Sequence, residues 1–150
     1  MGILESTSFV VKEVHKSDVS TPKIVISFKP LDQEIILAGA VLEAQYSVGK
    51  NYVLFITEGN PYEEALYIYL LNESLAVLDS IELSADYTSA ILKNLRVNSS
   101  SSICFSFFED SENWLLEFVS KPKTILWANK FPIKRKSPYV HKAYMLLTKS

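Results

Sequence analysis

The stretch Leu66-Tyr67-Ile68-Tyr69-Leu70 decides the fold class, because it alternates aliphatic and aromatic side chains at every second position. Successive side chains of a β-strand point to opposite faces of a sheet, so the two tyrosines share one face and the aliphatic residues share the other. We expect a strand here, in a sheet with one face in the core.

Similar short runs rich in Val, Ile, Phe and Tyr recur along the chain between polar turn clusters, which is typical of a β-rich protein. The long run over residues 34–45 contains Gly39, where we expect a bend or a bulge. The predicted strands cover residues 9–15, 24–28, 34–45, 52–57, 65–71, 76–83, 103–108, 114–119 and 123–128.

Two segments break this rhythm. Residues 86–95 carry apolar side chains at four-residue spacing after an aspartate that can cap a helix, which predicts a short helix. Ser137 and Pro138 then open a stretch with helical apolar spacing over residues 140–147, which predicts a C-terminal helix. A final strand over residues 144–148 is the alternative.

A faint internal repeat relates two parts of the chain. The segments that start at Tyr52 and Ile103 both run strand, acidic turn, strand, short turn, strand, and residues 1–45 form a more degenerate third unit. Such meanders resemble propeller blades, but propellers usually have four or more four-stranded blades, and this chain is too short for that. We therefore expect residues 1–150 to form a single mainly β domain. The predicted fold is an antiparallel β-sandwich or flattened barrel built from three-stranded meanders.

Composition narrows the chemistry. The single cysteine, Cys104, lies in an apolar run, and only His15 and His141 could serve it as a base, so we expect a buried, inert thiol. The segment Met1–Thr7 carries no secretory signal, and no apolar run is long enough to span a bilayer. We expect a cytoplasmic protein that does not associate with a membrane.

Motifs for metals and nucleotides are incomplete. Two distant histidines and one cysteine give no zinc spacing. The acidic run 109–112 lacks the glycine and distal glutamate of an EF-hand, and Gly49-Lys50 lacks the first glycine and the hydroxyl residue of a P-loop. We therefore expect no metal, no cofactor and no enzymatic activity.

Charge is distributed unevenly along the chain. Residues 1–120 hold all 17 acidic residues and 7 of the 15 basic residues, a formal charge of −10, whereas residues 121–150 hold the other 8 basic residues and no acidic residue. Lysines of this basic end alternate with Trp127, Phe131 and Tyr139, a composition that also suits nucleic acids. We interpret Trp127 and Phe131 as core residues and expect no direct nucleic-acid binding, because the rest of the chain would repel a polyanion.

The repeat relates two acidic turns, residues 57–64 and 109–113. If the two units are equivalent, both turns lie on one rim, where carboxylates surround aromatic side chains. Such a rim suits a basic protein partner, because charge accelerates association and aromatic residues supply binding energy. The predicted partner-binding residues are Glu58, Tyr62, Glu63, Glu64, Glu109, Asp110, Glu112 and Trp114.

With these features the whole chain resembles the small, diverse immunity proteins that bacteria make against secreted or contact-delivered toxins. The resemblance rests on length, acidity, an idiosyncratic β-rich sequence and the lack of catalytic motifs. It implies a protein that binds one cognate toxin, such as a basic nuclease, and blocks its active site. The basic segment 121–150 departs from a uniformly acidic immunity protein and leaves open which face meets the toxin.

Two other functions fit the same observations. One is a structural or scaffolding module that completes a propeller-like assembly by self-association. The other is a small-molecule carrier, since an antiparallel barrel of this size can enclose a ligand. Aromatic side chains that point into a cavity would favour the carrier, whereas a filled core with exposed acidic turns would favour the immunity protein.

Overall fold

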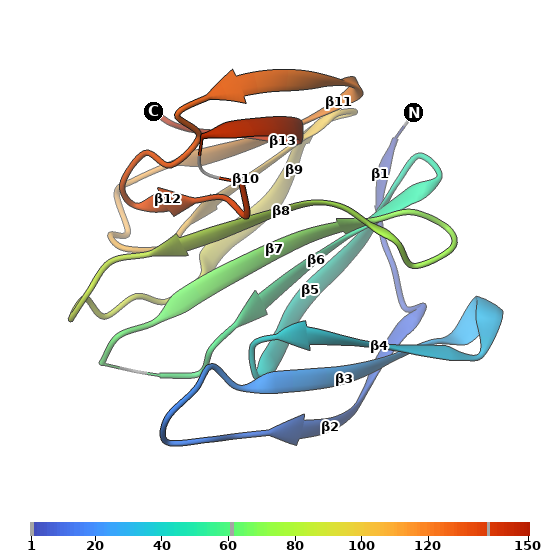
Figure 1. Cartoon of the computed structure of the whole chain (residues 1–150). Coiled ribbons are helices and arrows are strands. Elements are labelled where there is room, and N and C mark those ends of the chain that lie inside the picture. Colours follow the sequence, from blue (N-terminus) through green and yellow to red (C-terminus); the bar gives the residue numbers. More distant parts are fainter. Residues whose placement is uncertain (1, 61, 138) are drawn as a thin grey trace.

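The computed structural model describes residues 2–60, 62–137 and 139–150 and is almost entirely antiparallel β-structure (Figure 1). A central six-stranded sheet has the order β1-β5-β6-β7-β8-β12. Its strands are β1 (Ile3–Glu5), β5 (Val41–Val48), β6 (Asn51–Thr57), β7 (Ala65–Leu71), β8 (Val77–Ser84) and β12 (Ile133–Lys134).

Two smaller sheets lie on either side of the central sheet, so that the molecule has three layers (Figure 1). The N-terminal sheet is the meander β2 (Phe9–His15), β3 (Lys23–Phe28) and β4 (Gln33–Ala38). The C-terminal sheet has the order β13-β11-β10-β9. Its strands are β9 (Lys93–Ser99), β10 (Ser102–Ser106), β11 (Trp114–Leu126) and β13 (Val140–Lys149). The described strands therefore stack as a sandwich, and the expected β class is confirmed.

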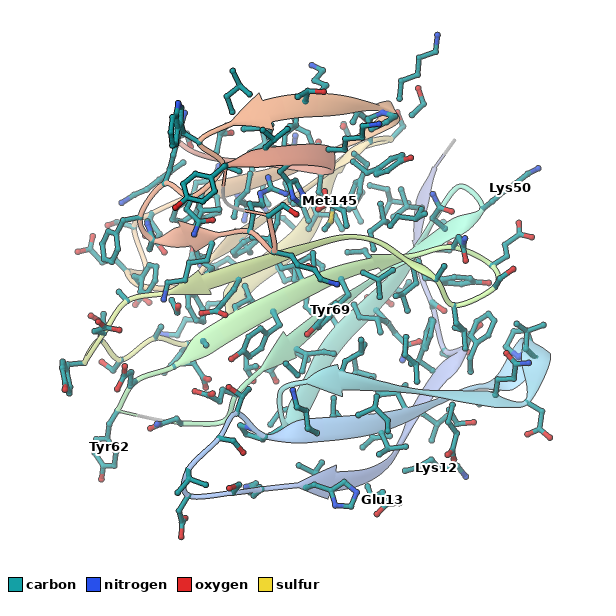
Figure 2. The ribbon with its side chains drawn as sticks, viewed as in Figure 1. Lys12, Glu13, Lys50, Tyr62, Tyr69 and Met145 are labelled. Carbon is teal, nitrogen blue, oxygen red and sulfur yellow. The ribbon has the colours of Figure 1, made fainter. Side chains whose placement is uncertain are left out.

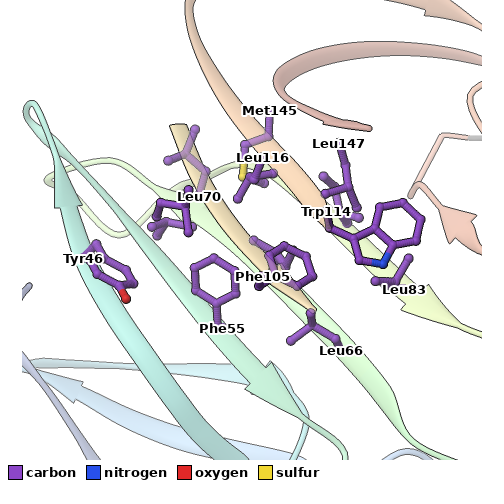
Figure 3. Close-up of a cluster of buried hydrophobic side chains, with 14 of the residues drawn as sticks. Tyr46, Phe55, Leu66, Leu70, Leu83, Phe105, Trp114, Leu116, Met145 and Leu147 are labelled. Carbon is purple, nitrogen blue, oxygen red and sulfur yellow. The ribbon is translucent and has the colours of Figure 1, made fainter. Parts of the chain in front are cut away.

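The central sheet buries both of its faces. On β6, Val53 and Phe55 belong to the core shared with the C-terminal sheet, and Leu54 and Ile56 belong to the core shared with the N-terminal sheet. In the first core the rings of Phe55 and Phe105 meet edge to face with centroids 5.9 Å apart (Figure 3). A strand that is buried on both faces has no polar face, which explains the continuous apolar run of β6.

β7 is covered on both faces, although we expected only one of its faces to lie in the core. Leu66 and Ile68 face the C-terminal sheet as expected, but Tyr67 and Tyr69 lie under the N-terminal sheet and are not an open face. Tyrosine tolerates this position because its hydroxyl keeps a polar partner. The hydroxyl of Tyr69 accepts a hydrogen bond of 3.1 Å from the backbone N–H of Ala38, at the end of β4.

The expected bend at Gly39 separates β4 from β5. Gly39 has a φ of 122°, and a Cβ built there would lie 2.2 Å from Cγ2 of the buried Ile56. Only glycine fits both this backbone conformation and this close approach. The long predicted run over residues 34–45 is therefore two strands in two different sheets.

Neither predicted helix forms. Residues 86–92 make an irregular connection and β9 follows, because this segment extends between two sheets and pairs with β10. The C-terminal segment is the alternative strand, β13, and Pro138, which the helix prediction used, lies outside the described residues. Among the described residues the helical content is one 3₁₀ turn, Lys29–Leu31.

The last predicted strand, residues 123–128, is not separate from the one before it. β11 runs from Trp114 to Leu126 and bends where four of its residues, 119–122, face the single Tyr144 of β13 (Figure 1). The third strand of this unit therefore continues the second, and β13 takes its place in the sheet. Cys104 on β10 is buried, as expected.

Candidate functional site

An acidic hollow of about 200 Å³ lies at one end of the sandwich, between the β6–β7 turn and the end of β8. We use the name acidic hollow for this site throughout. Five carboxylates and one ammonium group line it, namely those of Glu58, Glu63, Glu64, Glu82, Asp86 and Lys134.

The β6–β7 turn is held by its own side chains. Oε1 of Glu64 accepts hydrogen bonds of 3.0 Å from the backbone N–H groups of Gly59 and Ala65. The side-chain oxygen of Asn60 accepts from the N–H groups of Tyr62 and Glu63 at 3.1 and 3.3 Å. Glu64 is therefore a buried structural residue of the turn, whereas Tyr62 projects into solvent with 83% of its surface exposed (Figure 2).

The connection 85–92 joins the two acidic turns predicted from the sequence. The N–H of Glu64 donates to the carbonyl of Thr88 at 3.3 Å, and the N–H of Ile91 donates to the carbonyl of Phe107 at 3.0 Å. Both turns therefore lie at the same end of the sandwich. The same connection carries Tyr87, which is 92% exposed and adopts a positive φ of 55°.

Crowding of carboxylates changes the acidity of Glu58. Partial burial raises its pKa above the ordinary glutamate value, a hydrogen bond from Tyr67 opposes this, and repulsion from Glu64, Glu82 and Glu63 raises it further. Lys134 offsets part of the repulsion, because its Nζ lies 3.6 Å from Oε2 of Glu82. The hollow therefore carries excess negative charge that a cation would neutralise.

The second acidic turn separates into exposed and buried residues. Glu109 and Asp110 are exposed, and Asp110 pairs with Lys93 at 3.0 Å. Glu112 is buried, and its Oε1 accepts hydrogen bonds from the backbone N–H groups of Phe107 and Phe108 and from the indole N–H of Trp114.

Trp114 itself is only 3% exposed and packs in the core between the central and C-terminal sheets (Figure 3). Glu112 and Trp114 are therefore parts of the core and not exposed contact residues. The sequence position of Glu112 gave no sign of this, because a glutamate that accepts three local N–H bonds looks like any other turn glutamate. Trp114 opens a predicted strand, and that position suits a core residue as well as a contact residue.

Two aromatic residues of the basic segment 121–150 are exposed, although we expected them in the core. Trp127 and Phe131 are 70% and 80% exposed, so they are surface residues and not core residues. They lie in the segment that joins β11 to β13, on either side of which the paired strands end.

A buried charged cluster that the sequence did not predict joins β8 to the C-terminal sheet. Asp79 accepts from Arg135 Nη1 at 3.3 Å and contacts His141 Nε2 at 2.7 Å. Burial lowers the pKa of Arg135, and attraction to Asp79 opposes that shift. Strand alternation could have revealed this cluster from the sequence, because it places Asp79 and His141 on core-facing positions of β8 and β13.

A larger open groove of about 510 Å³ runs between β4 and β8, beside Tyr67 and Tyr69. It is a surface feature between layers, and the two cores on either side of the central sheet are filled with side chains. Within residues 2–60, 62–137 and 139–150, no group of three metal-ligating side chains comes together. No helix in the described part of the chain is long and apolar enough to cross a membrane.

Comparisons of the chain with protein-family models, with curated proteins and with solved structures gave no match.

Proposed function

We propose that this protein neutralises a basic protein by stoichiometric binding at the acidic hollow, as a toxin-immunity protein does, and that it is not an enzyme. The observation that carries the proposal is the convergence of Glu58, Glu63, Glu82 and Asp86 on one hollow that holds a single lysine. A lysine or arginine side chain of the partner would enter the hollow and pair with these carboxylates.

Two exposed aromatic residues flank the hollow and suit the same role. Tyr62 and Tyr87 belong to segments that the Glu64–Thr88 hydrogen bond holds together. A bulky residue at positive φ is uncommon and costs conformational energy, and the exposed Tyr87 gains no packing in return. Tyrosines in such positions commonly supply binding energy at protein interfaces.

The raised pKa of Glu58 supports the same mechanism. Burial is the largest cause of this raised pKa, and repulsion from Glu64, Glu82 and Glu63 adds to it, so the fold keeps several carboxylates together at some cost in stability. A cationic partner would remove this repulsion, so part of the binding free energy would come from relief of an unfavourable feature of the free protein. Charge of this density would also accelerate association at low salt.

The first test is protection of growing cells. The reading frame next to the gene for this protein is expressed in a test strain, with and without this protein. We expect the neighbouring product to stop growth, the parent protein to restore growth, and the variant E63K/D86K to fail. The matched control D18K/E34K makes the same charge change at exposed positions outside the hollow, and it should protect as well as the parent.

The second test measures binding of the two purified proteins. We expect one-to-one binding whose association rate falls as salt rises, because the Debye length shrinks from about 10 Å at 0.1 M to about 3 Å at 1 M. An association rate that is equal for the parent and for E63K/D86K would contradict the acidic hollow as the contact site.

A further inference from the structure

An exposed apolar patch lies at the end of the β11–β13 pair. It consists of Leu126, Trp127, Phe131, Tyr139 and Val140, whose exposed fractions run from 59% to 80%. We call these five residues the aromatic patch. Monomeric proteins seldom expose contiguous large apolar side chains, and such patches usually mark a contact surface.

The patch is built into the fold and is not a frayed end. Leu126 pairs with Val140 in the β11–β13 ladder, and the N–H of Trp127 donates to the carbonyl of Tyr139 at 2.8 Å. The two rings meet edge to face with centroids 5.6 Å apart. Trp127 has a φ of 52°, so the chain adopts an uncommon conformation at a residue whose indole points away from the core.

The segment that carries the patch is basic. Residues 121–150 include no acidic residue, and the exposed cations nearest the patch along the chain are Lys123, Lys130, Lys136 and Lys142. Lys149 lies at the other end of β13, opposite Trp114, and Lys134 pairs with Glu82. On the paired strands, Lys123 and Lys142 stand two to three residues behind the end formed by Leu126 and Val140. At about 3.3 Å per residue the Cα atoms of these two lysines lie roughly 7–10 Å behind the apolar end.

We propose, in contrast to the expectation from the sequence alone, that the aromatic patch docks this protein on an anionic lipid bilayer. Trp127, Phe131 and Leu126 enter the boundary between headgroups and acyl chains, and Lys123 and Lys142 contact lipid phosphates at headgroup depth. Interfacial proteins bury an apolar face to a depth of about 5–10 Å and gain electrostatic attraction to anionic lipids. In this protein the apolar end comes first and the two lysines follow at a comparable distance behind it.

A bilayer fits the patch better than a nucleic acid does. Leu126 and Val140 offer no ring on which a base could stack, but they do fit hydrocarbon. The lysines on the strands stand behind the apolar side chains and not between them. Residues 127–137 lie in the upper left of Figure 1, whereas the β6–β7 turn with Tyr62 lies in the lower left of both views, so this acidic turn is apart from the patch (Figures 1 and 2).

The experiment is co-sedimentation of the full chain with vesicles of phosphatidylcholine and phosphatidylglycerol at 3:1, compared with phosphatidylcholine alone. We expect binding to the anionic vesicles, weaker binding to the neutral vesicles, and a loss of at least tenfold in partitioning for W127S/F131S. The matched control L4S/I36S removes two other exposed apolar side chains and should bind like the parent. K123E/K142E should reduce binding to anionic vesicles and leave binding to neutral vesicles unchanged.

Quenching in the parent protein covers the case in which W127S/F131S does not fold. Lipids brominated on the acyl chain should quench the fluorescence of Trp127, which is exposed, and spare Trp114, which is buried. No binding to anionic vesicles, binding that W127S/F131S leaves unchanged in a folded protein, or no quenching would overturn the proposal. Tight binding of a thymidine 20-mer without vesicle binding would overturn it in favour of single-stranded nucleic acid.

Discussion

Asp79 and Arg135 form a buried ion pair, with Oδ2 and Nη1 3.3 Å apart and side chains 0% and 4% exposed. The pair sits against β13 where β11 bulges away from it. Oδ2 of Asp79 accepts from the N–H groups of Tyr144 and Met145, and Nη2 of Arg135 donates to the carbonyl of Met145. Two charged side chains thus bind backbone groups of β13 at the bulge, and so fasten the C-terminal sheet to β8.

Loss of the negative charge of Asp79 should destabilise the protein strongly. We expect Asp79→Asn to lower the free energy of unfolding by about 3–5 kcal/mol, because Arg135 would remain buried without its counter-charge. Urea denaturation followed by fluorescence measures the change. Asp18→Asn, at an exposed position, should change it by less than about 0.5 kcal/mol. Equal midpoints for the two variants would show that the pair does not hold the layers together.

Glu112 provides a second buried acceptor. We expect Glu112→Ala to cost about 2–4 kcal/mol of stability, because three N–H groups would lose a charged acceptor that is worth more than a neutral one. Glu112→Gln keeps the oxygen that accepts all three bonds, and should cost clearly less. Thermal unfolding of the two variants beside Asp110→Asn tests this order, which would be refuted by equal losses for alanine and glutamine.

The acidic hollow should make stability depend on pH. The raised pKa of Glu58 means that the folded protein binds this proton more tightly than the unfolded chain does. The resulting stabilisation is complete below the unfolded value of 4.5 and is lost as pH rises through the raised folded value. Glu58→Gln should therefore be more stable than the parent at pH 7 and gain nothing well below pH 4.5, as melting temperatures at both pH values would show.

Gly39 should tolerate substitution less than Gly59. A Cβ at Gly39 would lie 2.2 Å from Ile56 Cγ2, whereas the nearest atoms at Gly59 are 3.7 Å away. Both residues have positive φ, so we expect Gly59→Ala to cost about 1 kcal/mol from backbone strain alone. Gly39→Ala should cost more than about 2 kcal/mol, because overpacking adds to the strain. Similar unfolding midpoints for the two variants would contradict this account.

The sequence by itself determined the β class, most strand positions and the break at Gly39. Strand periodicity is a local property, and alternating runs such as Leu66–Leu70 express it without reference to the rest of the chain. The shared end of the two acidic turns could also be predicted, because the segments from Tyr52 and from Ile103 follow the same order of strands and turns, but the burial of Glu64 and Glu112 could not. The chain could not reveal that the tyrosine face of β7 is covered, since tyrosine suits both a solvated face and a buried one with a hydroxyl partner.

Only the tertiary structure decided which polar and apolar residues reach the surface. Glu112 and Trp114 are buried and Trp127 and Phe131 are exposed, the reverse of what their neighbours in the sequence suggest. Segment 86–95 has helical spacing, yet part of it pairs with β10, since strand pairing between layers outweighs a weak local helix preference. Burial depends on which layer covers a residue, and that covering comes from strands far apart in the chain, such as β8 and β13 around Asp79. A local pattern fixes the shape of each strand, but the assembly of three sheets fixes what each side chain meets.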